Sequence, residues 1–335
     1  MNLSKNIQKS IVFILLFITV LSFSSCMPSS PITKSDFALN TIVSITFYNS
    51  KDAACFDGCM NICRKYENLF SKTISGSDID RINQSEGTEV EVSEETAFLI
   101  EESLKYCNLT DGAVDITVAP VTDLWNFSDI YEGKRPPEDS EIKSLLGNID
   151  YKSVCVDGNT VSLNNPDSAI ELGFIAKGYI ADQIKDYVIS QGVQRCIINL
   201  GGNIVTVDNR TNPESFTIGI RKPFDDNGNT IDTVKVINKS VVTSGIYERS
   251  FTCDGTLYHH IINPKTGYPV SNNLCSVTII SDDSAKGDAL STTCLCLGLD
   301  KGMELINNTD DVEAVFVTDE YELFYSENLE NLYKN

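Results

Sequence analysis

The spacing of apolar positions predicts a strand and two helices in the first third of the chain. Residues 37–48 (FALNTIVSITFY) alternate apolar and polar side chains and are rich in β-branched residues, which predicts a strand. Residues 54–70 place apolar side chains three and four positions apart, the spacing of one helical face. A second helix is predicted to begin after Ser93 and run to Leu109, because a serine N-cap is followed by two glutamates in the first turn.

Short strands and tight turns dominate the rest of the chain. VCVDGNTVSL (154–163) predicts a hairpin with Asp157-Gly158 at its turn, and residues 196–207 predict two strands joined by a Gly-Gly turn. Residues 169–191 pass from a strand through a glycine-containing turn into a helix. Further strands are expected at 216–221, 234–237, 274–280, 314–318 and 322–325, and further helices at 140–146, 285–298 and 302–307. Because strands and helices mix without a strict βαβ rhythm, the pattern favours an α+β fold with a largely antiparallel sheet flanked by helices.

The first 25 residues have the organisation of an export signal. Lys5 and Lys9 precede an apolar run at 11–23, and small residues lead to Cys26. A cysteine in this position resembles that of a bacterial lipoprotein, and the apolar run is short for a membrane-spanning helix. We therefore expect a signal peptide over 1–25, a lipidated Cys26 with a tether over 26–36, and one large domain over 37–335. Such a protein is exported and held by its lipid on the outer face of the bacterial cytoplasmic membrane.

The chain is strongly acidic, with 26 basic and 47 acidic residues and a formal net charge of −21. Binding to nucleic acid requires basic patches that contact phosphates, so this composition argues against a nucleic-acid partner. It does not exclude a nucleotide that is held by backbone N–H groups and a divalent cation.

Eleven cysteines in an exported protein raise the question of disulfides. Several of them, such as Cys196 and Cys294, lie in apolar stretches where cysteine packs as a small buried side chain. Cys55, Cys59 and Cys63 recur every fourth residue, and a helix that packs this face inward is a simpler explanation than a metal cluster. We therefore expect thiols rather than disulfides.

Chemistry that needs an imidazole has one location in this chain. Its only two histidines, His259 and His260, are adjacent in YHHIINPKTGYPV (258–270), where a predicted strand enters an Asn-Pro and Thr-Gly turn. Neighbouring side chains on a strand point to opposite faces, so the two imidazoles cannot serve the same face. A structural histidine buried at a strand end is the alternative to a catalytic one.

Several other segments place small or polar residues at turns. LGFIAKGY (172–179) and NLGGN (199–203) are turns whose backbone N–H groups can face an anion, although neither has the spacing of a P-loop or a Rossmann fingerprint. Asp288 and Thr292 in KGDALSTT lie four residues apart on one helical face and offer oxygen ligands to a hard cation such as Mg²⁺; an ordinary helix N-cap is the alternative. TDGAVD (110–115) either lines a cleft or forms a simple turn. Glu248-Arg249 in TSGIYER either orient a phosphate or pair on the surface.

Seven segments together resemble the ApbE family, the FAD:protein FMN transferases, also called flavin transferases. The following segments occur in the family's order and spacing over roughly residues 37–324: TDGAVDITVAPVTDLWNF, ELGFIAKGYIADQI, INLGGNI, IGIRKP, VVTSGIYERSF, YHHIINPKTGYPV and DALSTTCLCLG. The resemblance implies Mg²⁺-dependent transfer of FMN from FAD to a Thr or Ser hydroxyl of an acceptor protein, with release of AMP. Typical acceptors are subunits of membrane redox complexes, and many members are exported lipoproteins.

The resemblance also implies a role for individual residues. His260 falls on the proposed catalytic histidine. Ala176 falls on a main-chain metal ligand, and Asp288 and Thr292 fall on its side-chain partners. The flavin contacts fall on Leu39, Ser71, Ala113, Val114, Asp115, Gly173, Tyr179 and Ile262.

The chain departs from the family pattern at three places. Leu39-Asn40-Thr41 replaces the usual Met-Gly-Thr, Glu171 replaces an Asp, and Asn263 replaces another Asp. Three other functions therefore stay open at this point. They are an FAD pyrophosphatase that uses water in place of the acceptor, a non-catalytic FAD-binding lipoprotein, and a solute-binding lipoprotein without Mg²⁺ dependence.

Overall fold

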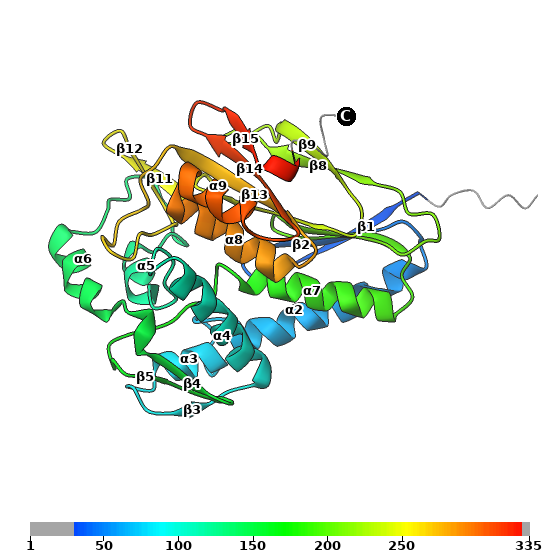
Figure 1. Ribbon diagram of the computed structural model, residues 1–335. Helices are drawn as coiled ribbons and strands as arrows, with labels where there is room; N and C mark the ends of the chain where they lie inside the picture. Colours follow the sequence, from blue (N-terminus) through cyan, green and yellow to red (C-terminus); the bar gives the residue numbers. More distant parts are fainter. Residues whose placement is uncertain (1–29, 330–335) are drawn as a thin grey trace, which may run out of the picture.

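Within residues 30–329, which the computed structural model describes, an eight-stranded antiparallel sheet forms the centre of the molecule (Figure 1). Its strand order is β1-β2-β6-β7-β10-β13-β14-β15. The strands are β1 (Ile32–Ala38), β2 (Thr41–Phe47), β6 (Arg195–Leu200), β7 (Asn203–Asp208), β10 (Ser240–Gly245), β13 (Leu274–Ser281), β14 (Val312–Thr318) and β15 (Leu323–Tyr325). The central strand β13 is buried along its whole length, as expected for a strand that is covered on both faces.

Helices cover one face of this sheet and a hairpin covers the other. Alternate residues of β13 separate the two layers, because Ile279 packs into the helical core and Ile280 packs against the hairpin. The covering helices are α2 (Phe56–Phe70), α7 (Ala176–Ser190), α8 (Ser284–Leu297) and α9 (Leu299–Asn307). The hairpin consists of β8 (Phe216–Arg221) and β9 (Thr230–Val236).

The remaining elements gather beside the helical face, at the lower left of Figure 1. They are α3 (Asp78–Asn83), α4 (Glu94–Leu109), α5 (Ala119–Trp125), α6 (Asp139–Leu145) and a small sheet of β3 (Val90–Glu91), β5 (Thr160–Leu163) and β4 (Val154–Asp157), with short 3₁₀ turns at Leu146–Asn148 and Tyr151–Ser153. A further 3₁₀ turn at Asp52–Cys55 directly precedes α2. A second hairpin of β11 (Ser250–Cys253) and β12 (Thr256–His259) projects from the main sheet toward this region.

An aromatic cluster joins that projecting hairpin to α5. Trp125 lies 5.4 Å from Tyr258 and 6.4 Å from Phe251, measured between ring centroids. The indole Nε1–H of Trp125 also donates a 2.8 Å hydrogen bond to the Gly267 carbonyl. Aromatic pairs at such distances stabilise the fold beyond the burial of their surface. The cluster therefore holds in place the end of β12 and the residues after it, where both histidines lie.

The predicted α+β fold with a largely antiparallel sheet flanked by helices is confirmed. Ser93 caps α4 as expected, since its hydroxyl accepts a hydrogen bond from the Thr96 N–H. The Asp157-Gly158 hairpin and the Gly-Gly hairpin are also present.

The N-terminal prediction is wrong in its detail. Residues 37–48 form a hairpin and not one strand, because Leu39 and Asn40 have positive φ and reverse the chain between β1 and β2. Residues 32–36, which were expected to be part of the tether, belong to β1 and pair with β2. Cys26 and the signal segment 1–25 lie outside the described residues. In the part of the chain that the structure describes, no helix is long and apolar enough to cross a membrane.

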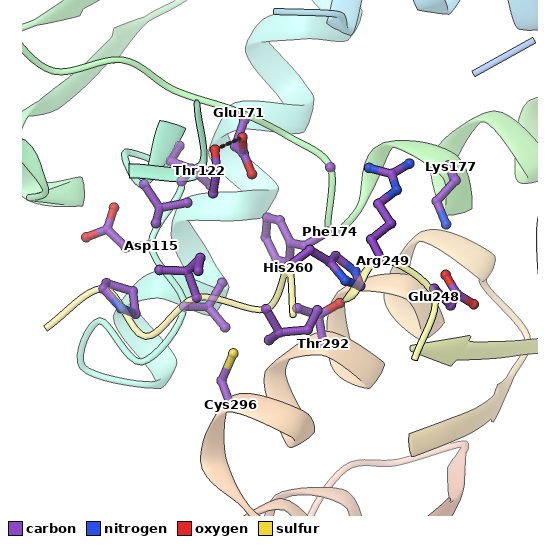
Figure 2. Close-up of a pocket in the computed structure, with 17 residues that line it drawn as sticks. Asp115, Thr122, Glu171, Phe174, Lys177, Glu248, Arg249, His260, Thr292 and Cys296 are labelled. Atoms are coloured by element: carbon purple, nitrogen blue, oxygen red, sulfur yellow. Dashed lines mark hydrogen bonds between the residues drawn. The ribbon is translucent and has the colours of Figure 1, made fainter. Parts of the chain in front are cut away.

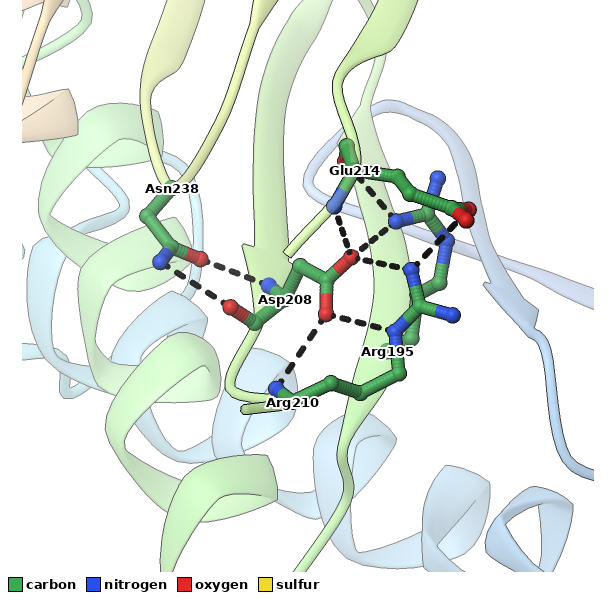
Figure 3. A network of polar contacts seen from close by, with 5 residues as sticks. All are labelled: Arg195, Asp208, Arg210, Glu214 and Asn238. Carbon is green, nitrogen blue, oxygen red and sulfur yellow. Dashed lines mark hydrogen bonds and ion pairs between the residues drawn. The ribbon is translucent and has the colours of Figure 1, made fainter. Parts of the chain in front are cut away.

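A buried carboxylate closes the end of the β6–β7 hairpin (Figure 3). The side chain of Asp208 is completely buried and accepts hydrogen bonds from Arg195, from Arg210 and from the Glu214 N–H. Its main chain is bound on both sides by the Asn238 amide, at 2.6 and 3.1 Å. The Arg210 guanidinium, and then the other donors, hold the pKa of Asp208 well below its usual range. The group therefore stays ionised and fully hydrogen-bonded, and it stabilises the β6–β7 hairpin and the segment that follows it.

Candidate active site

A cavity of about 190 Å³ lies where five segments from distant parts of the sequence meet (Figure 2). It is lined by residues of 114–122, of the 171–177 turn that starts α7, of Glu248-Arg249, of 260–264 after β12, and by Thr292 and Cys296 on α8. All five segments belong to motifs that the sequence singled out, so the fold brings most of the predicted chemistry to one place.

The two ends of the cavity differ in character. Thr122 and Glu171 lie on one side of the cavity in Figure 2. This end is apolar beside them, because the Thr122 N–H donates to the Val118 carbonyl, and Val118 packs in one apolar cluster with Ile262. The lining also includes Val114, Ile116, Ile261 and Pro264. The other end carries Lys177 and Arg249, with Glu248 beside them. His260, Phe174 and Thr292 lie between the two ends in Figure 2. This arrangement suits a ligand with a flat apolar ring system at one end and anionic groups at the other.

His260 faces this cavity as a neutral imidazole. Its ring is half-buried, and its Nδ1 atom is shielded from solvent and has no hydrogen-bond partner in the described chain. Burial, and then the positive charge of Arg249, lowers the pKa of His260 to about 3. The imidazole is therefore unprotonated at neutral pH, and Nε2 is the nitrogen that a group in the cavity can reach.

His259 points the other way and has a structural role. It is only 5% exposed, its Nε2–H donates to the Val270 carbonyl at 3.0 Å, and its Nδ1 accepts from the Ile261 N–H at 3.3 Å. Burial lowers the pKa of His259 to about 4. The prediction that the two imidazoles serve opposite faces is confirmed.

The predicted metal ligands lie where α7 crosses α8. Asp288 is buried and accepts a 2.9 Å hydrogen bond from the Gly178 N–H, two residues after Ala176. Thr292 lies one turn later on α8, and its hydroxyl is 3.0 Å from the Ser244 hydroxyl. Burial raises the pKa of Asp288, while the Lys177 charge lowers it in part. A buried carboxylate of this kind is stabilised by a nearby cation.

One observation favours a hydrated hard cation at this crossing. Asn203, in the Gly-Gly hairpin, lies against Asp288, and neither atom of its buried amide completes a hydrogen bond of good geometry among the described residues. The donor set of a carboxylate, a hydroxyl and a main-chain carbonyl consists entirely of oxygen, which Mg²⁺ prefers. Throughout residues 30–329, this crossing included, no group of three or more His, Cys, Asp or Glu side chains is arranged to hold a metal.

Four of the predicted flavin contacts line the cavity: Val114, Asp115, Gly173 and Ile262. The carboxylate of Asp115 is occupied within the protein, because it accepts hydrogen bonds from the Thr117 N–H and hydroxyl and from the Tyr151 N–H. Asp115 therefore shapes the 113–118 loop, and its side chain has few acceptor sites left for a ligand.

The other four predicted flavin contacts do not line this cavity. Ala113 precedes the lining loop, and Ser71 ends α2 next to Lys72. Leu39 occupies the β1–β2 turn, where its N–H donates to Glu67. Tyr179 faces the opposite side of the 172–179 turn, where its ring packs against Tyr66 and Phe70. Their contact with a ligand stays a prediction.

The sequence did not identify every residue of the site. Lys177, Phe174 and Cys296 line the cavity without having been selected, although all three lie inside segments that were. Lys72, by contrast, donates a hydrogen bond to Glu171, which lies 99 residues later in the sequence, and no local sequence pattern predicts that contact.

Asn263, which replaces the family's Asp, keeps a local role. Its side-chain oxygen accepts from the Lys265 N–H at 2.9 Å, and its carbonyl accepts from the Gly267 N–H at 2.8 Å. The turn after His260 therefore forms with an amide in place of a carboxylate.

Comparisons with known proteins identify the family of this chain. A model of the ApbE family matches residues 39–316. The chain is 36% identical over 280 residues to the FAD:protein FMN transferase of Klebsiella pneumoniae (strain 342), covering 83% of this chain and 86% of that relative. It superimposes with a TM-score of 0.83 on the crystal structure of the ApbE protein of Thermotoga maritima, at 32% identity, covering 91% of this chain and 100% of the other. The flavin transferase ApbE of Vibrio cholerae gives a TM-score of 0.78 at 25% identity, with coverage of 91% and 99%.

Proposed function

The chain belongs to the ApbE family and is an FAD:protein FMN transferase, and we propose that it uses Mg²⁺ and His260 to transfer FMN to a Thr or Ser hydroxyl of its acceptor. The cavity's two-ended character is the observation that supports this best. FAD carries two flat ring systems, isoalloxazine and adenine, joined through a pyrophosphate. The apolar end matches a ring system, which we assign to the isoalloxazine, and the Lys177–Arg249 end matches the pyrophosphate.

Asp288, Thr292 and the carbonyl of Ala176 are the residues that would hold the metal. Their oxygen chemistry fits, and the incompletely bonded Asn203 amide beside Asp288 supports a polar occupant of the crossing. When bound, Mg²⁺ neutralises charge on the phosphate oxygens during transfer. The Ser244 hydroxyl, 3.0 Å from that of Thr292 and 2.7 Å from that of Ser291, orients the first turns of α8.

Side chains of the protein accept the proton of the acceptor hydroxyl and stabilise the negative charge of the phosphates. The acceptor hydroxyl oxygen forms a bond to the phosphorus on the FMN side, and the bond from that phosphorus to the bridging oxygen breaks, so that AMP leaves with that oxygen. The hydroxyl proton passes to Nε2 of His260, which is neutral and accessible from the cavity. Lys177 and Arg249 stabilise the anionic phosphates, since preorganised charges in a secluded site act strongly.

The acceptor and the location are also part of this proposal. The chain is proposed to be exported, lipidated on Cys26 and held on the outer face of the cytoplasmic membrane. Its acceptor is proposed to be an FMN-binding subunit of a membrane redox complex. The support comes from the sequence of residues 1–26, which is typical of lipoproteins.

The test follows the mass of the acceptor. Full-length protein is mixed with FAD, Mg²⁺ and an FMN-binding acceptor domain, and we expect the acceptor to gain the mass of one FMN while AMP is released.

Two variants test the assigned residues in the same assay. Asp288→Ala should lower Mg²⁺-dependent transfer by about 10²-fold or more, and His260→Ala should lower transfer by about 10²-fold while FAD still binds. FAD cleavage with an unmodified acceptor would instead indicate a pyrophosphatase. Intact, bound FAD would indicate a binding protein. Full activity of Asp288→Ala would remove that residue from the metal site.

A further inference from the structure

A closed polar cluster terminates the apolar end of the cavity. Lys72 Nζ lies 2.5 Å from Glu171 Oε2, 2.6 Å from Asp123 Oδ1 and 2.8 Å from Thr122 Oγ1. The Thr122 hydroxyl in turn donates to Glu171 Oε2 at 2.7 Å. Of these groups, Thr122 and Glu171 line the cavity, whereas Lys72 supports them from behind.

The cluster leaves one oxygen of the cavity-lining Glu171 carboxylate without a hydrogen bond. Both hydrogen bonds to the Glu171 carboxylate go to Oε2, and Oε1 receives none from the described residues. The side chain of Glu171 is 25% exposed although it is held from behind. A carboxylate oxygen in such a position accepts a hydrogen bond and repels other acceptors.

The charge of Lys72 keeps this acceptor in place. Burial alone lowers the pKa of Lys72, but the Glu171 and Asp123 carboxylates raise it overall, so the ammonium stays charged in a partly buried position. Removal of the ammonium would leave two carboxylates side by side, and like charges repel each other. Lys72 therefore holds the orientation of Glu171.

We propose that Glu171, held by Lys72, is the specificity residue of the cavity and accepts a hydrogen bond from an imide N–H at the edge of the ligand's ring system. The inference rests on the proposed function, because an isoalloxazine ring presents one such N–H between two carbonyl groups. Lys72 is a positioning residue in this arrangement, since it acts on the ligand through Glu171. A ring without that donor is rejected, because the Glu171 oxygen would lose its partner.

Ligand binding by the full-length protein tests this without any acceptor. The quenching of flavin fluorescence is titrated with FAD and with an FAD analogue methylated on the imide nitrogen, and competition by ADP-ribose reports the part of FAD without the isoalloxazine ring, that is, the adenosine and the diphosphate. We expect FAD to bind about tenfold or more tightly than the methylated analogue, as for loss of a hydrogen bond to a charged group. Lys72→Met should reduce that ratio to within about twofold and leave competition by ADP-ribose unchanged, and Lys72→Arg should restore most of it.

Two controls keep the outcome interpretable. Lys239→Met removes another ion pair, Lys239–Asp282 at 2.7 Å, which is away from the cavity, and should leave the ratio unchanged. In transfer assays Lys72→Met should raise KM for FAD about tenfold and change kcat within about twofold. Equal binding of the two flavins by the unmodified protein would overturn the inference, and so would a Lys72→Met variant that weakens FAD, the analogue and ADP-ribose alike. FAD that binds with the expected ratio but is never transferred would contradict the proposed function and leave this inference standing.

Discussion

At the scale of single residues, the two histidines differ because one step along a strand changes the face on which the ring lies. His259 is enclosed by main-chain partners on both ring nitrogens, so its ring is fixed in one tautomer. His260 faces the cavity with Arg249 and Lys177 nearby. Burial makes both imidazoles neutral, and only His260 is placed to accept a proton from a ligand.

The neutral state of His259 makes folding sensitive to acid. Its pKa is 6.5 when the chain is unfolded and about 4 when it is folded, so between these values the unfolded chain binds a proton that the folded chain does not. Stability therefore falls as pH decreases from about 6.5 to about 4, and this group alone contributes on the order of 3 kcal/mol. Urea unfolding at several pH values should show a weaker pH dependence for His259→Gln than for the unmodified protein. Coincident pH dependence of the two proteins would mean that His259 is not held neutral.

Residue-level predictions from sequence succeeded where a contact is local. Asp288 and Thr292 lie four residues apart on one helix, and the structure confirms that they share α8. The Glu171–Lys72 contact spans 99 residues and depends on how α2 and the 171–177 turn pack, so no spacing rule reveals it. Local periodicity carries no information about such a contact.

At the scale of elements, the crossing of α7 and α8 organises the proposed metal site. Gly178 lies near the start of α7 and packs against the first residues of α8. A Cβ atom at Gly178 would overlap the Ser284 carbonyl, which is main chain and cannot rotate away. The same glycine donates its N–H to Asp288, so helix packing and ligand placement depend on one residue.

We expect Gly178→Ala to force the two helices apart. The variant should lose about 2–4 kcal/mol of unfolding free energy, since overpacking displaces main chain, and should bind Mg²⁺ more weakly than the unmodified protein. Calorimetric Mg²⁺ titration together with urea unfolding measures both effects. Gly147→Ala is the matched control, because a Cβ there meets nothing within 4 Å. Unchanged stability and Mg²⁺ affinity in Gly178→Ala would show that the crossing tolerates displacement.

Element-level predictions failed where a turn has no sequence signal. The Asp157-Gly158 and Gly201-Gly202 turns were predicted because glycine accepts positive φ. Leu39 also adopts positive φ, at 56°, although leucine rarely does so and its presence does not predict a turn. The first strand was therefore predicted as one element, although it is a hairpin.

At the scale of the whole molecule, the fold class and the gathering of the site follow from different information. Alternation and turn chemistry are sufficient for an α+β assignment with an antiparallel sheet, because they act locally. The order β1-β2-β6-β7-β10-β13-β14-β15 includes a step from β2 to β6, which local patterns cannot supply. The resemblance of seven segments to one family supplies the missing long-range information, because it assigns these segments to one site before the strand order is known.

The cysteines provide the last test, because their state depends on the whole fold. All ten cysteines within residues 30–329 are free, and most are buried between the sheet and the helices. Burial raises the pKa of Cys59, Cys63 and Cys107 to about 12, so the reactive thiolate is scarce at neutral pH. We expect the buried cysteines of the native protein to react slowly with a thiol reagent and the exposed Cys155 to react fastest.

Denaturation should release the remaining thiols without any reductant. The thiol count in denaturant should be the same before and after treatment with a reductant, and the thermal midpoint should not depend on reductant, because no disulfide contributes to stability. A Cys155→Ser variant serves as the control and should abolish the fast phase of labelling only. If prior reduction increased the thiol count, disulfides would be present and the cysteines would not be simple core residues. An unchanged count would mean that an eight-stranded sheet with helices on one face and a hairpin on the other is stable without any disulfide.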